Sequence, residues 1–415
     1  MGYNPGSVRI ESLVITSPLT GEWNATTNFL SCSILETIFT PGITAHIEVL
    51  DDSDMVGTMK VQGLETVTLA FTKVNDDLAF GLGDQTAKYY FHLNSIKEIT
   101  PAGSNKTKTY QLNCISKESL LGRTFNVQQA YKAPISNIVE DVFTSMPFVR
   151  SDIAIEPTKG VRDLKLSSQP VFNAIEMLRK EAVSATFETS NYMFWQSMDS
   201  YHFKTLEYTV NQPPVKVLKQ DFTVGQSISK SIDDNILAWK VIQSFDAMNR
   251  VKAGVVSQRV AVFDPNTLSY RLAPFAPNPL SAMGSWSYEE FRSIMGGPNS
   301  NRNVLTYRNP SNTIGIPKSN VPANIAEKQL NLAQMQEQLL RMRLIGDPIL
   351  QAGSIVFCNI PNATSVVPDN EYPDPQASGK WLISKVEHEI KLAVNSPRYI
   401  CNVECLKGAY SGVYQ

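Results

Sequence analysis

The segment His388-Glu-Ile-Lys-Leu392 comes nearest to a metal-binding motif in this sequence. The HExxH motif of zinc proteases places a second histidine one helical turn after the first, so that both rings reach one metal ion. Here Leu392 stands in that place, and the surrounding residues follow the pattern of a strand, in which positions i and i+4 do not form a helical pair. We therefore expect His388 to be a half-buried polar residue of a sheet and not a metal ligand.

Adjacent carboxylates are the next candidates for chemistry, because two carboxylates that face each other across a cleft can cleave glycosidic bonds. All such pairs lie at expected strand ends or turns, where solvated carboxylates are the rule. The sequence has no phosphate-binding glycine motif and no GxSxG elbow. We therefore expect no catalytic, cofactor-binding or metal-binding residue, and an enzyme is the weakest of three hypotheses. The carboxylate pairs are Asp51-Asp52, Asp76-Asp77, Asp233-Asp234 and Glu289-Glu290.

The composition excludes several classes of protein. A chain of 415 residues has room for about two to four domains, and its formal net charge of −2 gives no electrostatic signature for nucleic acid or an anionic membrane. No apolar run approaches the roughly 20 residues of a membrane helix, and the first residues lack the features of a secretion signal. The 5 cysteines are scattered, without a CxxC pair, which is typical of reduced thiols. We expect a soluble protein without specific nucleic-acid binding or stable membrane binding.

The elements that position these residues begin with a series of strands. Apolar and polar residues alternate in several of them, as in an antiparallel sheet with one face against a core. Closure of six such strands into a small barrel is the economical way to remove exposed edges. The predicted strands cover residues 8–16, 27–39, 44–50, 66–74, 88–99 and 107–117.

The middle of the chain mixes helices and strands. Helices are predicted after Pro134 and over residues 168–184, and strands over residues 192–196 and 201–208, so this part is an α+β domain. Residues 222–245 and 251–263 read as mostly extended, and residues 268–272 pair back across a turn that begins at Asp264. The long segment 273–321 is rich in Pro, Asn, Ser and Gly; a connection of this length is functional or partly flexible, with a short helix near residues 287–295.

The C-terminal part begins with the clearest predicted helix, after Pro322. Asn324 and Glu327 form a capping box. The spacing of Leu332, Met335, Leu339 and Met342 fits one apolar helical face. Strands are then predicted over residues 354–360, 381–391 and 398–406.

A short internal similarity connects the two ends of the chain. Ile96–Ile99 and Val386–Ile390 end long strands, and Tyr110–Asn113 and Tyr399–Asn402 lie in their expected hairpin partners. The pattern suggests two β domains of one kind.

The order of elements resembles the baseplate hub proteins of contractile-tailed bacteriophages and the wider tail-hub group of contractile injection systems. Three stretches carry the resemblance: Ile34–Ser53, then Lys117–Gly122 with the following Pro134 helix, and finally the C-terminal part. The C-terminal part contains a Gly-Asp-Pro turn, a strand begun by glycine and a strand ending in Val-x-His. The corresponding residues, expected to be structural markers of the fold, are Gly346, Asp347, Pro348, Gly353 and His388.

The resemblance implies an α+β, mainly β fold with two similar small antiparallel β-barrels of the tube type and a middle α+β domain. By analogy with the family, residues 1–118 form the first barrel and residues 216–245 with 336–415 form the second. The middle domain is discontinuous and contains residues 119–215 and 246–335, including the loop 273–321.

The same resemblance implies a structural virion protein. Three copies would form a pseudo-sixfold ring that joins the hexameric tail tube to the trimeric central spike and leaves a channel for DNA and the tape-measure protein. Its place would be the tail baseplate, after assembly in the host bacterial cytoplasm, with other baseplate proteins as further partners and no cofactor. A different class of function stays open, namely a β-rich host-attachment protein that binds carbohydrate through an exposed aromatic residue such as Trp286.

Overall fold

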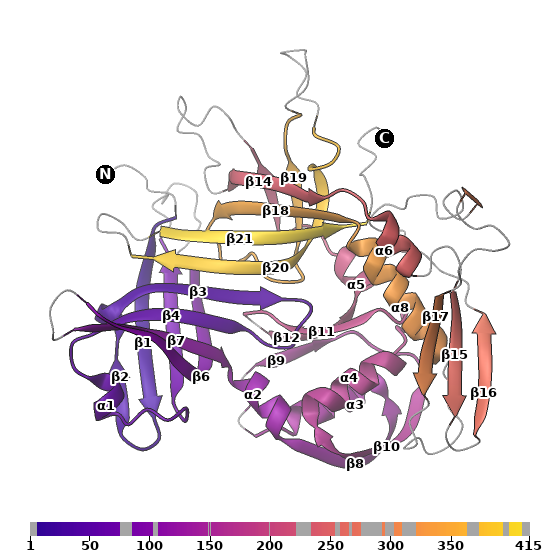
Figure 1. The fold of residues 1–415 in the computed structure, drawn as a ribbon, viewed down its shortest axis with the longest axis horizontal. Coiled ribbons are helices and arrows are strands. Elements are labelled where there is room, and N and C mark those ends of the chain that lie inside the picture. Colours follow the sequence, from indigo (N-terminus) through magenta and orange to yellow (C-terminus); the bar gives the residue numbers. More distant parts are fainter. Residues whose placement is uncertain are drawn as a thin grey trace.

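The computed structural model shows a mainly β, α+β fold (Figure 1). The structure describes residues 6–74, 85–102, 107–147, 149, 151–198, 200–220, 234–253, 258–264, 268–274, 293–294, 303–308, 321–362, 373–392 and 398–408. In the described part of the chain, no helix is long and apolar enough to cross a membrane.

The N-terminal strands form the first β unit. They pair in the order β3-β4-β7-β6-β5-β1-β2, and each neighbouring pair is antiparallel. All six predicted strands are present, while the short β2 and the one-turn helix α1 (Met55–Thr58) were not predicted. The strands are β1 (Val8–Ser17), β2 (Gly21–Asn24), β3 (Phe29–Thr37), β4 (Thr44–Asp51), β5 (Thr66–Lys73), β6 (Gln85–Pro101) and β7 (Lys108–Ser116).

The second β unit combines two strands from the centre of the chain with the C-terminal strands. Its order is β14-β18-β21-β20, and β19 pairs with both β20 and β13. The three predicted C-terminal strands are confirmed as β19, β20 and β21. The strands are β13 (Lys216–Lys219), β14 (Ile236–Gln243), β18 (Gln338–Ile345), β19 (Ile355–Asn359), β20 (Gly379–Lys391) and β21 (Arg398–Lys407).

The two β units share one sheet, because β20 pairs antiparallel with β3. This pairing removes one exposed edge from each unit. The apolar core is continuous across the junction, and the rings of Phe71 in the first unit and Tyr399 in the second meet edge to face with their centroids 5.3 Å apart. In Figure 1 the strands of both units are seen side by side at the β3–β20 contact.

Between the units in sequence lies a helix-containing part with its own core. The predicted helices are confirmed as α3 and α4, and the expected apolar stripe of α3 is buried. The predicted strand 201–208 is a strand only as far as Thr205, and its last three residues belong to the short helix α5. The elements are α2 (Lys117–Thr124), β8 (Asn126–Pro134), α3 (Ile135–Thr144), β9 (Asp152–Ile155), β10 (Val161–Pro170), α4 (Val171–Glu181), β11 (Tyr192–Gln196), β12 (Ser200–Thr205) and α5 (Leu206–Val210).

A three-stranded sheet contains part of the long segment. After α6 (Ala247–Lys252), β15 (Gln258–Asp264) pairs antiparallel with β16 (Ser269–Pro274), as predicted, and parallel with β17 (Asn303–Arg308). The strand β17 was not predicted. Of the helix predicted near residues 287–295, only Ser293 and Ile294 are described, and they are helical.

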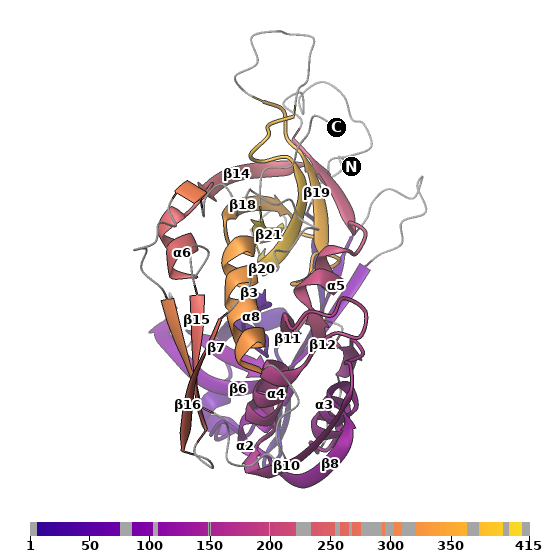
Figure 2. The ribbon, with the colours of Figure 1, turned by 90° about the vertical axis from the view of Figure 1, so that its right-hand side faces the viewer.

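The C-terminal helix differs from its prediction at both ends. Helix α8 (Val321–Met335) begins before Asn324, so the predicted capping box is wrong, and Glu327 instead lies 3.5 Å from the hydroxyl of Ser190. Leu339 and Met342 are residues of β18 and not of the helix. Alternating burial along β18 shows why the prediction failed: an apolar pattern of period two coincided over a few residues with helical spacing. Figure 2 shows α8 beside β15 and α4, which it contacts.

Candidate assembly interface

The junction between the two β units is a regular antiparallel ladder. Residues 385–391 of β20 stand opposite residues 37–31 of β3 without a register break. The residues on one face of this ladder are buried in the common core, which fixes the register, because a shift by one residue would expose that face. The buried residues are Val386, His388 and Ile390 of β20 and Cys32, Ile34 and Glu36 of β3.

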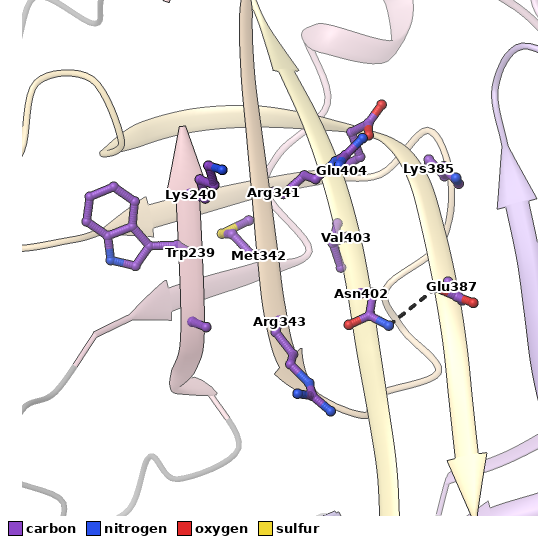
Figure 3. Close-up of a pocket in the computed structure, with 11 residues that line it drawn as sticks. Trp239, Lys240, Arg341, Met342, Arg343, Lys385, Glu387, Asn402, Val403 and Glu404 are labelled. Atoms are coloured by element: carbon purple, nitrogen blue, oxygen red, sulfur yellow. Dashed lines mark hydrogen bonds and ion pairs between the residues drawn. The ribbon is translucent and has the colours of Figure 1, made fainter. Parts of the chain in front are cut away.

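The opposite face of the same strands is polar. Ser33 Oγ donates a hydrogen bond across the junction to Glu387 Oε1 at 2.6 Å, and Asn402 Nδ2 donates to Glu387 Oε2 at 3.3 Å. On β18 and β21, Arg341 Nε donates to Glu404 Oε2 at 2.9 Å. Figure 3 shows Glu387, Asn402, Arg341 and Glu404 among the side chains of β14, β18, β21 and β20 that line a hollow of about 480 Å³. The hollow carries four cationic side chains, Lys240, Arg341, Arg343 and Lys385, and two carboxylates, Glu387 and Glu404.

His388 lies in the internal junction, opposite Ile34 of the first unit. Its Nδ1 is 2.7 Å from the hydroxyl of Tyr399 and 3.3 Å from Cys401 Sγ, and the residue is fully buried. Burial lowers the pKa of His388 to about 4, so the ring is neutral at pH 7. The neutral ring forms its hydrogen bond through Nδ1 and fills core space, so the prediction of a half-buried position was wrong.

Asp347 connects the second unit to the first by charge. Its Oδ2 accepts a hydrogen bond from Lys216 Nζ at 2.6 Å and lies 3.7 Å from Lys73 Nζ of β5. Burial alone would raise the pKa of Asp347, but the charges of Lys216 and Lys73 outweigh it and hold the pKa below its usual value. The carboxylate is therefore ionised and is held between the buried Lys73 and the partly buried Lys216.

The remaining marker residues form the turn and the strand entry near this carboxylate. A side chain at Gly346 would place Cβ 2.0 Å from Tyr399 Cγ, and Gly353 has a φ of +89° with Trp195 Cζ2 2.6 Å from its ideal Cβ position. Pro348 is buried in the turn that follows Asp347. Glycine is needed at Gly353 for its backbone angle and at both positions for space. We propose that the five marker residues shape the contact between the β units.

Glu36 belongs to the same junction and was missed by sequence reasoning. The fully buried carboxylate accepts hydrogen bonds from the backbone N of Ala352 at 3.2 Å and from the hydroxyl of Tyr89 at 3.4 Å. One signal was available: in β3 the core-facing positions are Cys32, Ile34 and then Glu36, so a charged residue occupies an apolar position of the alternation.

Several strand edges of the shared sheet, among them those of β2 and β13, have no strand beside them in the part of the chain that the structure describes, and two more bear on assembly. The first belongs to β6, where residues 85–92 pair with β5 and residues 94–101 continue past the end of β5. The second is the outer edge of β14, which pairs only with β18 among the described strands. We call these the open edges. Unpaired strand edges are sites at which another chain can add a strand.

The acidic residues of these pairs that the structure describes are not gathered into one site. Asp51 accepts hydrogen bonds from Tyr110 and from the backbone of Met55, which explains the turn into α1, and Asp234 lies 3.2 Å from Lys216 Nζ. The pairs at residues 76–77 and 289–290, as well as residue 233, lie outside the described residues, as does Trp286. Within the ranges described, no group of three or more His, Cys, Asp and Glu side chains is placed to hold a metal ion.

Comparison with known proteins identifies the fold. No protein-family model matches the sequence, and no curated protein matches it. Among solved structures, the tail protein from Neisseria meningitidis MC58 matches with a TM-score of 0.54 and 11% identity, over 95% of this chain and 96% of that one. The chain therefore has the fold of a tail protein.

Two further solved structures match with lower scores. The 43 kDa tail protein of prophage MuSo2 from Shewanella oneidensis has a TM-score of 0.48 and 7% identity, covering 96% of this chain and 98% of that one. The c3393 protein of E. coli, a component of the type VI secretion system, has a TM-score of 0.45 and 9% identity, covering 98% of this chain and 77% of that one.

Proposed function

We propose that this chain is a structural baseplate or tail hub protein of a contractile tail, and that three copies form a ring with six similar β lobes. One observation carries the proposal: the chain joins two β units edge to edge through β20 and β3, and each unit still has an open edge, along β14 in the second unit and along residues 94–101 of β6 in the first. Two β units that join edge to edge within one chain can join in the same way between two chains. Such heterologous contacts close into a ring when the rotation per contact divides a full turn.

The ring would serve as an adaptor between two symmetries. With two β units from each of three chains, one side of the ring offers six similar lobes to a hexameric tail tube. The middle domains occur once per chain, so they give the other side threefold symmetry, which suits a trimeric central spike. The fold shared with a tail protein supports this reading.

The polar face of the shared sheet would line the channel of the ring. Around the hollow it carries the cationic Lys240, Arg341, Arg343 and Lys385 with the carboxylates Glu387 and Glu404, and the whole chain has a net charge of −2. The two carboxylates offset half of these cations, and Arg341 is engaged by Glu404, so few cations are left for the phosphate contacts on which tight binding to DNA depends. Such a lining would let DNA and the tape-measure protein pass.

The oligomeric state tests this proposal. Multi-angle light scattering and native mass spectrometry of the purified chain, alone and with the tail tube and spike proteins, should give three times the 46.1 kDa of one chain. A species that stays monomeric at high concentration and in the presence of both partners would overturn it.

A further inference from the structure

The two β units repeat each other strand by strand. In the first unit the order β3-β4-β7-β6 ends where β5 pairs with β6, and in the second the order β14-β18-β21-β20 ends where β19 pairs with β20. In this comparison β6 corresponds to β20, β7 to β21, β4 to β18 and β3 to β14. Because the units repeat, the pairing of β20 with β3 can serve as a model for the pairing of β6 in one copy with β14 in another. We call the β3–β20 pairing the template.

Irregularities in the ladders fix the comparison residue by residue. On β6, Asn94 is the extra residue relative to β7, and on β20 Ser384 is the extra residue relative to β21. The residue before each one donates its backbone N–H to the entry of the neighbouring strand: Leu93 to Glu65 O and Ile383 to Ser354 O, both at 2.9 Å. Residues 93–97 of β6 therefore correspond to residues 383–387 of β20.

The other two strands agree in the same way. Leu30 is extra between Phe29 and Ser31 on β3, and Leu237 is extra between Ile236 and Ala238 on β14. Residues 29–34 of β3 therefore correspond to residues 236–241 of β14. One irregularity thus aligns β6 with β20, and a second, independent one aligns β14 with β3.

Burial reveals what is missing at the open edges. On β20, Val386 is fully buried beside β3, while its counterpart Ile96 on β6 is partly exposed. On β3, Ile34 is fully buried beside β20, while its counterpart Val241 on β14 is partly exposed. Ile96 and Val241 are therefore exposed to the degree expected of Val386 and Ile34 if β3 and β20 were not paired.

We infer that residues 94–101 of β6 in one copy pair antiparallel with β14 of a second copy, in the register set by the internal junction. Transfer of the template places Lys97 opposite Gln243, because their counterparts Glu387 and Leu35 are opposite each other. Past the next irregularity on each strand, it places Thr100 opposite Lys240, because their counterparts are Glu389 and Ser33.

The two open edges carry matching insertions that support this register. Relative to the internal junction, β6 has one additional residue between Lys97 and Thr100, and β14 has one between Val241 and Gln243. An insertion on one strand alone would break the ladder between copies. Because both strands have one at the same level, Lys97 stays opposite Gln243 and Thr100 stays opposite Lys240, with two residues between the pairs on each strand.

The side chains between these pairs are suited to burial by a second copy. Ile99 is 56% exposed and would lie opposite Val241, and Ile242 is 41% exposed and would lie opposite Glu98. Glu98 would also be diagonal to Lys240, close enough for attraction between opposite charges. Covering these apolar groups favours association, since buried apolar area contributes about 25 cal/mol per Å².

This inference rests on the proposed ring and adds its contact, which disulfide cross-linking can test. All five native cysteines are buried, so added cysteines would be the reactive ones. A chain with Thr100→Cys and Lys240→Cys should give covalent trimers on a non-reducing gel after mild oxidation. A mixture of the two single variants should give covalent dimers and nothing larger. The control, Thr100→Cys with Ile242→Cys, would need a slip of two residues and should stay uncross-linked.

The outcomes separate this inference from the ring itself. If light scattering shows an oligomer while Thr100→Cys with Lys240→Cys gives no cross-link, or the control pair reacts instead, the register is wrong and the ring stands. If no oligomer forms, the ring and the contact both fail. Hydrogen exchange on the unmodified oligomer provides a second measurement without substitutions: the amides of residues 95–101 and 239–243 should exchange more slowly than in the dissociated chain, and equal rates would overturn the inference.

Discussion

The carboxylate of Asp347 in the second β unit lies 3.7 Å from the ammonium group of Lys73 in the first, and both side chains are buried. Lys216 completes the group at 2.6 Å from the same carboxylate. The two β units are thus held together by a buried charge group as well as by a shared sheet and an apolar core.

Replacement of this carboxylate should destabilise the protein. Asp347→Asn removes the carboxylate that faces both Lys73 and Lys216, and removing one member of a buried ion pair costs about 3–5 kcal/mol. The free energy of unfolding from urea titration measures the loss. Glu188→Gln breaks the exposed pair with Lys159 and is the matched control, expected to change stability little because solvent screens exposed ion pairs. Equal effects of the two substitutions would contradict the role given to Asp347.

Gly353→Ala should destabilise the protein more than Gly160→Ala. Both glycines have positive φ angles, +89° and +77°, so both substitutions carry the cost of about 1–2 kcal/mol for a left-handed backbone. At Gly353 the new methyl group would also meet the Trp195 ring at 2.6 Å, whereas nothing lies within 4 Å at Gly160. Overpacking adds about 1–3 kcal/mol at Gly353 alone. Thermal unfolding of the two variants gives the difference, and equal losses would show that space at Gly353 does not matter.

His388 should make stability depend on pH in acid. Its pKa is lowered from 6.5 to about 4 in the folded protein, so between these values the unfolded chain binds the proton and the folded chain does not. The stabilisation is fully present above pH 6.5 and is lost as the pH falls toward 4, by about 3 kcal/mol in total.

The comparison needed is between the unmodified protein and His388→Gln, because carboxylates titrate in the same range in both. The free energy of unfolding should fall less steeply in the variant between pH 6.5 and pH 4. Parallel curves for the two proteins would show that His388 is not the group responsible.

An acidic residue at the open edge of β6 should weaken association without unfolding the chain. Ile99 is 56% exposed, so Ile99→Asp removes little folded-state packing but would bury a charge against Val241 of a second copy. We expect the association constant from sedimentation to fall by a factor of ten or more, roughly 1.4 kcal/mol. Leu268→Asp, at a turn position directly before β16 that is 79% exposed, is the control and should leave association unchanged. A similar loss in both variants would mean that the effect is not specific to the edge.

The sequence allowed most strands to be predicted, because alternation of apolar and polar residues along a sheet with one buried face is a local signal. The internal similarity of Ile96–Ile99 and Val386–Ile390 also pointed to the strands that correspond in the structure. The pairing of β3 with β20 could not be predicted from the sequence, since it joins residues as distant as Ser33 and Glu387, which are 354 positions apart. Nothing in a local pattern specifies such a pairing.

Errors arose where two local patterns agreed by coincidence or where a signal was weak. Leu339 and Met342 continued the spacing of helix α8 yet belong to β18, whose core-facing residues alternate. Asn324 and Glu327 matched a capping box although the helix begins earlier, at Val321. Tertiary packing decided these cases, because β18 pairs with both β14 and β21 and so has a sheet position to fill.

Electron microscopy of the assembled protein tests the central claim most directly. Particles of the chain, alone or bound to the tube and spike proteins, should show a threefold ring with six similar β lobes around a channel. Each lobe boundary within a chain should be the β3–β20 junction, and each boundary between chains should join β6 to β14. Particles with any other symmetry, or a ring whose lobes meet through other surfaces, would contradict the account.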